Sequence, residues 1–163
     1  MKNRNFLILL AILLVAGGTL FFLPNDEKKI RRNLASLADY CSSSREEGSI
    51  ETLKKAALSA KLCSNPCRIQ VKSFNINRDF NKKDISDHIL MMKKMLANTR
   101  FDFHDTVIDF PDDDRAEIMT TLRLEGKTKD NRFTDAYEMN ITVTKSEGDW
   151  FFSSFTVVEF IEQ

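Results

Sequence analysis

The sequence has 163 residues and carries 24 basic residues (Lys and Arg) against 24 acidic ones (Asp and Glu), so its formal net charge is zero. A chain of this length suffices for one domain of common size with a single hydrophobic core. The basic residues are interleaved with acidic residues along the chain, and this pattern argues against nucleic acid as a partner.

The N-terminal end of the chain predicts a membrane-targeting segment. Phe6 to Leu23 is a run of 18 residues without a charged side chain. As a helix, such a run extends about 27 Å, close to the thickness of the hydrocarbon core of a bilayer. We therefore predict a signal anchor at residues 1–24, which forms one transmembrane helix in the lipid bilayer, and a single domain at residues 25–163. Cleavage near Ala16–Gly18, which would release a secreted soluble domain, is the alternative.

The orientation of this anchor is predicted from two conflicting signals. Lys28, Lys29, Arg31 and Arg32 follow the apolar run, and a basic excess on that side favours a cytoplasmic domain. Signal-like segments near an N-terminus instead usually translocate the chain that follows them. We expect the domain to face the periplasm or the cell exterior.

Two helices are predicted after the anchor. A cap at Asn25 or Asp26 starts the first, whose apolar side chains recur every three or four residues until Ser42-Ser43-Ser44 ends it. Ser49 caps the second helix, and Ser64-Asn65-Pro66 ends it.

The cysteines bear on the compartment of the domain. Cys63 and Cys67 bracket the Pro-containing turn after the second helix, so we predict a disulfide between them, which would persist only in an oxidising compartment. Three reduced thiols, Cys41 included, are the alternative. The cysteine spacing is not that of a zinc site, and Asp112-Asp113-Asp114 lacks the ligand spacing of a calcium loop. We therefore expect no metal site and no cofactor.

A strand and a third helix come next. Arg68 to Ile76 alternates as a strand, but the parity of its apolar residues switches halfway, which predicts a bulge near Ser73. Asn81 caps the third helix, whose buried stripe runs from Ile85 to Leu96. His88 shares this stripe and is expected to be a packed or boundary histidine.

From Phe101 onward the hydrophobic period changes to two. This period predicts four strands at Phe101–Phe110, Arg115–Lys127, Phe133–Lys145 and Trp150–Ile161. Their short connections require antiparallel neighbours. The last strand is apolar on both parities, which predicts a central strand, a strand covered on both sides, or a contact with a protein partner or a second copy of the chain.

The order of these elements resembles the nuclear transport factor 2-like superfamily, whose cone-shaped fold is shared by ketosteroid isomerases and scytalone dehydratase. The turn Glu147-Gly148-Asp149-Trp150, which leads into the final aromatic strand, adds to the resemblance. It covers residues 26–163 and implies an α+β fold, in which three N-terminal helices pack on a curved, mainly antiparallel sheet. A cystatin-like sheet around one helix is the nearest alternative. Members of the superfamily use the pocket of the cone for catalysis, ligand binding or partner binding, so the resemblance does not imply one activity.

Three side chains are candidates for catalysis in such a pocket. Asp135 falls among the apolar residues of its strand, beside Tyr137, and a carboxylate in a ligand pocket lined by both could act as a general base. His104 could supply an acid or a base, and Tyr40 could donate a hydrogen bond. The plainer interpretation is a solvated Asp135 near the end of its strand, with His104 and Tyr40 packed on the domain.

Two functions are compatible with these patterns. The first is a membrane-tethered binding or scaffold domain outside the cytoplasm, with a protein or a small apolar ligand as its partner. The second is a small isomerase-like or dehydratase-like enzyme, or a hydrolase, that uses Asp135 with His104 or Tyr40. We favour the first, because the sequence contains no catalytic motif.

Overall fold

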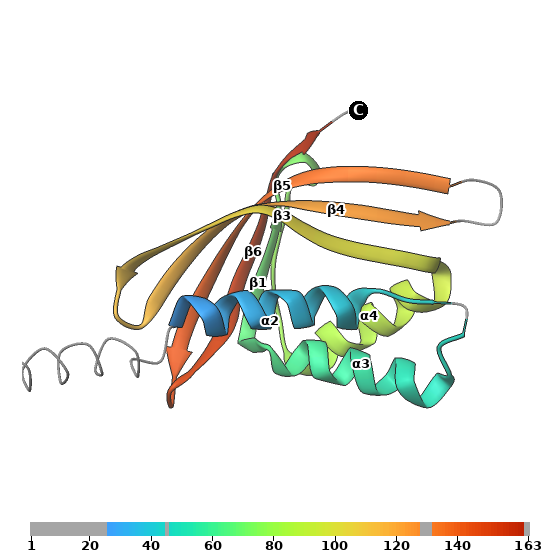
Figure 1. The fold of residues 1–163 in the computed structure, drawn as a ribbon, viewed down its shortest axis with the longest axis horizontal. Coiled ribbons are helices and arrows are strands. Elements are labelled where there is room, and N and C mark those ends of the chain that lie inside the picture. Colours follow the sequence, from blue (N-terminus) through green and yellow to red (C-terminus); the bar gives the residue numbers. More distant parts are fainter. Residues whose placement is uncertain (1–25, 45, 128–131, 162–163) are drawn as a thin grey trace, which may run out of the picture.

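A computed structural model describes residues 26–44, 46–127 and 132–161 of the chain. Within these residues it contains three α-helices, α2 (Asp26–Cys41), α3 (Ser49–Lys61) and α4 (Lys82–Met95), and the short 3-10 helix η1 (Lys72–Phe74). The strands are β1 (Cys63–Val71), β2 (Ile76–Phe80), β3 (Ala97–Asp112), β4 (Arg115–Lys127), β5 (Arg132–Ser146) and β6 (Asp149–Ile161). Figure 1 shows the helices on one side of the long, curved strands.

The predicted membrane segment, Phe6 to Leu23, lies outside the described residues. Within the described part of the chain, no helix is both long and apolar enough to cross a bilayer. The anchor therefore stays a prediction from the sequence.

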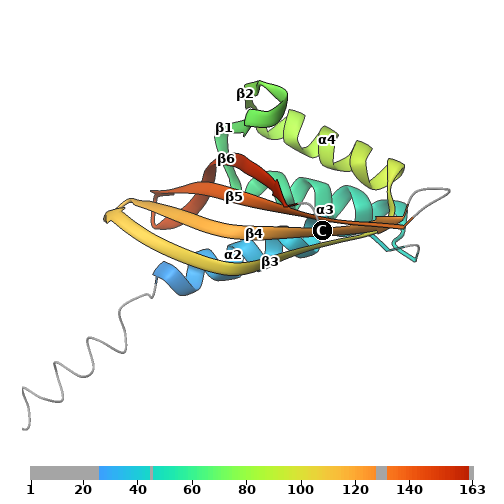
Figure 2. The ribbon, with the colours of Figure 1, turned by 90° about the horizontal axis from the view of Figure 1, so that it is seen from above.

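The described strands form one mixed sheet in the order β2-β1-β6-β5-β4-β3. Only β1 and β6 run parallel. The neighbours among β3 to β6 are antiparallel, as predicted, and β1 and β2 form a further antiparallel pair. β6 is an interior strand, which fits its apolar character. The β5–β6 hairpin turns through Glu147 and Gly148, both with positive φ (54° and 86°), as a two-residue type I′ turn requires. In Figure 2, β1 and β2 lie next to α4 at one edge of the sheet.

The segment predicted as one bulged strand, Arg68 to Ile76, is instead the start of a hairpin. β1 ends at Val71, η1 follows, and Asn75, with φ of 52°, leads the chain back into β2. A tight turn interrupts the alternation of side chains just as a bulge does. The switch of parity therefore marks this turn, and the bulge predicted near Ser73 is wrong.

Two bulges in β6 explain why its apolar residues occupy both sequence parities. Phe152 and Ser154 face consecutive residues of β5, so Ser153 is an extra residue, and a second register shift makes Val158 another. Each extra residue moves the following side chains to the opposite face. The inner face of β6 therefore collects Trp150, Phe152, Phe155, Val157 and Phe160. The outer face of this strand is not continuously apolar, so the feature that suggested a homodimer has another cause, and the homodimer stays a prediction.

The core lies between the inner face of the sheet and the helices. Its fully buried members include Ile30 of α2, Ile118 and Ile141 of the sheet, and Trp150 and Phe152 of β6. Burying a side chain of this size contributes on the order of 2 kcal/mol to the stability of the domain. The buried side chains of α2 lie on one apolar stripe, as the period of the helix predicts.

The first turn of α2 is fixed to the β5–β6 hairpin. Lys145 Nζ donates to Asp26 Oδ2 at 2.7 Å and lies 5.3 Å from the ring centroid of Trp150. The hydrogen bond from Lys145 lowers the pKa of Asp26 below its ordinary value. This contact sets where the chain enters the domain.

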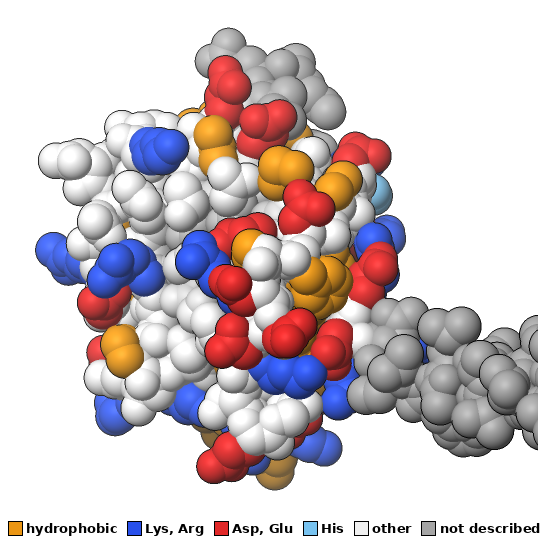
Figure 3. Space-filling model, turned by 90° about the vertical axis from the view of Figure 1, so that its left-hand side faces the viewer, with side chains coloured by type: hydrophobic (Ala, Val, Ile, Leu, Met, Phe, Trp, Pro, Cys, Tyr) orange, Lys and Arg blue, Asp and Glu red, His pale blue; other side chains and the backbone are white. Residues whose placement is uncertain are grey.

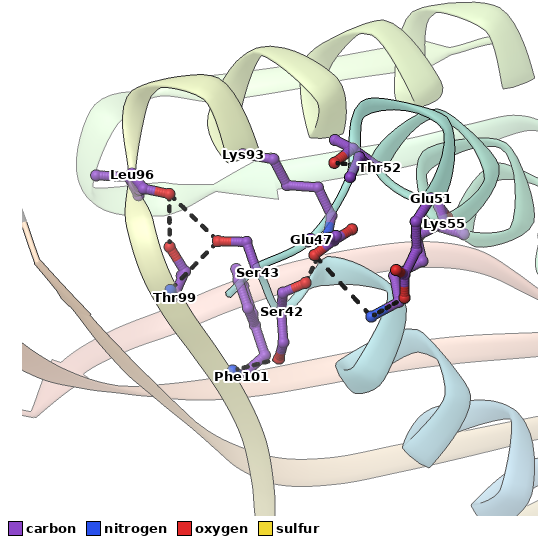
Figure 4. A network of polar contacts seen from close by, with 12 residues as sticks. Ser42, Ser43, Glu47, Glu51, Thr52, Lys55, Lys93, Leu96, Thr99 and Phe101 are labelled. Carbon is purple, nitrogen blue, oxygen red and sulfur yellow. Dashed lines mark hydrogen bonds and ion pairs between the residues drawn. The ribbon is translucent and has the colours of Figure 1, made fainter. Parts of the chain in front are cut away.

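A buried polar network fixes the segment between α2 and α3 (Figure 4). Lys93 Nζ of α4 donates to the carbonyl oxygen of Ser42 and lies 3.2 Å from Glu47 Oε1. The side chains of this ion pair are 1% and 4% exposed, and Lys55 Nζ lies 4.0 Å from the same carboxylate. Ser42 Oγ accepts the backbone N–H of Phe101 at 3.0 Å. The network thus holds the segment against both α4 and β3.

We expect Lys93→Met to lower the free energy of unfolding by about 3 kcal/mol, because it leaves the buried Glu47 carboxylate with only the more distant Lys55. The matched control is Lys83→Met, which removes an exposed ion pair with Asp87 on the same helix and should leave the free energy of unfolding nearly unchanged. Urea unfolding of the full chain measures both losses. Equal losses would contradict the importance of the buried pair.

Candidate functional site

An apolar cavity of about 880 Å³ lies between the helices and the inner face of the sheet. Its walls come from α2, α4, the β1–β2 hairpin and the inner faces of β3 to β6. Leu37, Ile85, Phe103, Leu122, Met139 and Phe155 are among the lining side chains. The register shifts in β6 and β3 place these apolar residues on one face, so the cavity follows from the same geometry as the core.

Few polar side chains reach this cavity. Asn75, Asn77 and Arg78 of the β1–β2 hairpin and His88 of α4 line it, and all four are exposed, which places them at its opening. No Asp or Glu of the described residues lines the cavity. The interior therefore suits an apolar molecule, with polar contacts only at the entrance.

The cysteines contribute to the cavity wall. Cys41 and Cys63 line it, and burial raises the pKa of Cys41 to about 11. The predicted bridge between Cys63 and Cys67 is not formed in the structure, which contains all three cysteines as free thiols. Cys63 Sγ donates to the carbonyl oxygen of Ser59 at 3.6 Å, and Cys67 Sγ donates to that of Arg68 at 4.0 Å.

His88 is the imidazole that the cavity contains. Its Nδ1–H donates to the carbonyl oxygen of Asp84 at 2.7 Å, because a carbonyl can only accept. The neutral ring then carries no proton on Nε2. Phe80 packs edge-on against the ring, with centroids 5.3 Å apart. The sequence placed His88 on the stripe of α4 that faces the sheet, but it gave no sign that this stripe borders a cavity.

Asp135 and Tyr137 lie together, as predicted, but outside the cavity lining. Tyr137 Oη donates to Asp135 Oδ2 at 3.1 Å, and the Tyr137 ring packs on Phe160 with centroids 5.1 Å apart. Burial, followed by the neighbouring carboxylate, raises the pKa of Tyr137 to about 12. The side chain of Asp135 is exposed, which agrees with the plainer interpretation of this residue.

His104 and Tyr40 do not join Asp135 at the cavity. Phe103 lines the cavity, so its neighbour His104 points to the outer face of β3, where it is exposed. Tyr40 is half-buried on α2 beside Cys41 but does not line the cavity. The cavity therefore brings none of the three predicted catalytic side chains together.

The acidic turn Asp112-Asp113-Asp114 forms the exposed tip of the β3–β4 hairpin. Figure 3 looks onto this end of the molecule, where acidic and basic side chains are interspersed. Among the residues that the structure places, no group of three or more His, Cys, Asp and Glu side chains has the geometry to hold a metal ion.

No protein-family model and no curated protein sequence matches the chain. Solved structures do resemble it. A protein from Kribbella flavida has 15% identity and a TM-score of 0.68, with 82% of this chain and 89% of that chain covered. A hexachlorocyclohexane dehydrochlorinase (LinA, type 2) has 10% identity and a TM-score of 0.66, with 83% and 86% covered. A protein of unknown function with a cystatin-like fold from Nostoc punctiforme has 13% identity and a TM-score of 0.62, with 85% and 93% covered.

At these identities, the comparisons concern the fold alone. The three helices and the six-stranded mixed sheet of the described residues agree with that likeness. The domain therefore has a cystatin-like α+β fold, with three helices packed on a six-stranded mixed sheet.

Proposed function

We propose that the domain binds a small apolar molecule in its cone and is held at a membrane by the N-terminal segment. The cavity of about 880 Å³ carries this proposal. Its volume falls within the roughly 300–1,000 Å³ of known small-molecule sites, which are mostly apolar with a few polar groups. The absence of a carboxylate among its described lining residues supports binding over carboxylate catalysis.

The entrance supports an amphipathic anion as the ligand. Arg78 lines the cavity and is exposed, and no ion pair of the described residues involves it. Its guanidinium is therefore free to pair with a carboxylate or sulfonate head group. The apolar body of such a ligand would fill the interior beside Leu122 and Met139.

We expect the full chain to bind the neutral fluorescent probe N-phenylnaphthylamine and expect Leu122→Trp to weaken this binding at least tenfold, about 1.4 kcal/mol, by filling the cavity. Thr121→Trp is the matched control, because the next side chain of β4 points to the outer face. Leu122→Phe is a milder second variant, and urea unfolding verifies that each variant is folded. Equal affinities for all folded variants would place the probe elsewhere and contradict the proposal.

The charge of the head group is tested with a second probe. Arg78→Gln should weaken anilinonaphthalene sulfonate about fivefold, as expected for an exposed ion pair. The same substitution should leave the neutral N-phenylnaphthylamine unaffected. A loss of both probes would indicate a damaged cavity, and a loss of neither would rule out an anionic head group at Arg78.

A second candidate function is proton abstraction from a substrate in the cavity. His88 favours it, since the neutral ring with its proton on Nδ1 has an unprotonated Nε2 that can act as a base. The hexachlorocyclohexane dehydrochlorinase has a similar fold, so this scaffold is compatible with an enzyme.

We expect catalysis by His88, if it occurs, to accelerate exchange of the α-hydrogens of cyclohexanone in deuterated water. His88→Gln should then reduce the exchange rate about a hundredfold, within the usual contribution of a general base, without changing the affinity for N-phenylnaphthylamine. Proton NMR measures the exchange. The binding proposal instead expects the wild type and the variant to exchange at the rate of buffer.

Cell fractionation of the full chain tests the predicted anchor. We expect the full chain to sediment with membranes and expect deletion of residues 6–23 to release it, because only this run is long and apolar enough to span a bilayer. Protease added to intact cells should digest the domain if it faces the exterior, and protease added after opening of an outer membrane should do so if it faces the periplasm. Protection until the inner membrane is lysed would reverse the predicted orientation.

A further inference from the structure

We propose that Cys63 and Cys67 are a redox-active pair that forms a reversible disulfide on the wall of the cavity, while Cys41 stays a free thiol. The cysteine pair is separate from the ligand contacts discussed above. Three features support it, namely the local register of β1, the burial of the two sulfurs and the different surroundings of Cys41.

The register of β1 brings the two cysteines together. In a regular strand, residues four apart lie about 13 Å from each other, well beyond the reach of a disulfide. Cys63, however, pairs with Phe152 and Arg68 pairs with Ser154. Cys63 and Arg68, five residues apart in β1, are therefore separated by the length of only two residues of β6, or about 7 Å. The chain between them loops out through the exposed Asn65 and returns Cys67 to the side of Cys63.

Both sulfur-bearing residues are buried, with Cys63 2% and Cys67 0% exposed. The mutual influence of the two thiols lowers the pKa of Cys67 and raises that of Cys63. A thiolate is the nucleophile of disulfide exchange. Cys63 is among the residues that line the cavity, so the cavity is the side from which we expect a small reagent to approach the pair.

Cys41 also lines the cavity, but its surroundings differ. Burial raises its pKa to about 11. Cys41 is not part of the pair in which a second thiol of lowered pKa can take up the proton, so it stays protonated at neutral pH and reacts slowly. It lies on α2, outside the looped segment of β1. Cys41 is therefore the internal control that the chain itself provides.

The co-reactant is a low-molecular-weight disulfide. The Cys67 thiolate takes up the proton of the Cys63 thiol as the Cys63 sulfur attacks one sulfur of the small disulfide. The small S–S bond breaks, one small thiolate leaves and a mixed disulfide remains on Cys63. Cys67 passes its proton to the departing small thiolate and, again a thiolate, attacks the Cys63 sulfur. The Cys63–Cys67 bond forms and the second small thiolate leaves and takes up a proton from water. The protein loses two electrons and two protons, and the small disulfide gains them as two thiols. An added dithiol reverses both steps.

The test treats the full chain, folded in mild detergent, with oxidised glutathione. Remaining thiols are alkylated under denaturing conditions, and the masses of the tryptic peptides are measured by mass spectrometry. Cleavage after Lys61 and Arg68 leaves both cysteines in one peptide, Leu62 to Arg68, while Cys41 falls in another. We expect the first peptide to be two hydrogens lighter and unalkylated, Cys41 to be fully alkylated, and dithiothreitol to restore both thiols of the pair.

Single substitutions distinguish a bond between Cys63 and Cys67 from the other possible products of oxidation. Cys41→Ser should form the bond at the rate of wild type, whereas Cys67→Ser should stop at a glutathione adduct on Cys63. Three results would overturn the proposal: a lasting adduct on wild-type Cys63, a bond between Cys41 and Cys63, or two fully alkylated thiols in the Leu62–Arg68 peptide at every glutathione ratio.

Discussion

Side chains alternate between the two faces of a β-strand, so one extra residue sends every later side chain to the opposite face. The sheet of this domain contains such register shifts in β1, β3 and β6. In β3, Asp105 takes a positive φ of 51°, and Phe103 and Ile108 both face inward although they differ in parity. Without these shifts, the same apolar residues would be divided between core and water. The inner face of the cone therefore depends on where each strand departs from regular pairing.

Curvature is the second consequence of these shifts, because a bulged strand bends and twists more strongly than a regular one. A flat sheet would lie close against the helices, whereas the bent sheet leaves room for the cavity between them. The helices must then be held at a distance from part of the sheet. Apolar contacts of α2 do this at one end. At the other end, the buried ion pair of Lys93 and Glu47 fixes the α2–α3 segment. Such a pair contributes more to the position of the segment than to the net stability of the domain.

The sequence contained enough information to predict the helices and the four long strands, because hydrophobic period and capping act locally. The cap predicted at Ser49 is wrong, since Ser49 is the first residue of α3 and Gly48 precedes it without a side-chain cap. Asn81 caps α4 through a 2.9 Å bond from the backbone N–H of Asp84, and β4 has its predicted bounds. The bulges could not be predicted in the same way. An extra residue such as Ser153 has no composition of its own, and its signature, apolar residues on both parities, is also that of a strand covered on two faces. The turn at η1 was mistaken for a bulge for the same reason.

The candidate site was harder to predict than the fold, because convergence of side chains depends on register as well as on residue type. Asp135 has the inward parity of β5, yet its side chain is exposed and accepts a hydrogen bond from Tyr137. His104 is one residue away from the inward parity and therefore faces outward. His88, which the pattern of α4 marked only as a boundary residue, reaches the cavity because the hairpin of β1 and β2 adds a wall that the sequence did not reveal. A general base must lie within reach of its substrate, and no carboxylate of the described residues lines the cavity. The interior of the cavity is therefore apolar, and its one arginine among the described residues, Arg78, is exposed at the opening.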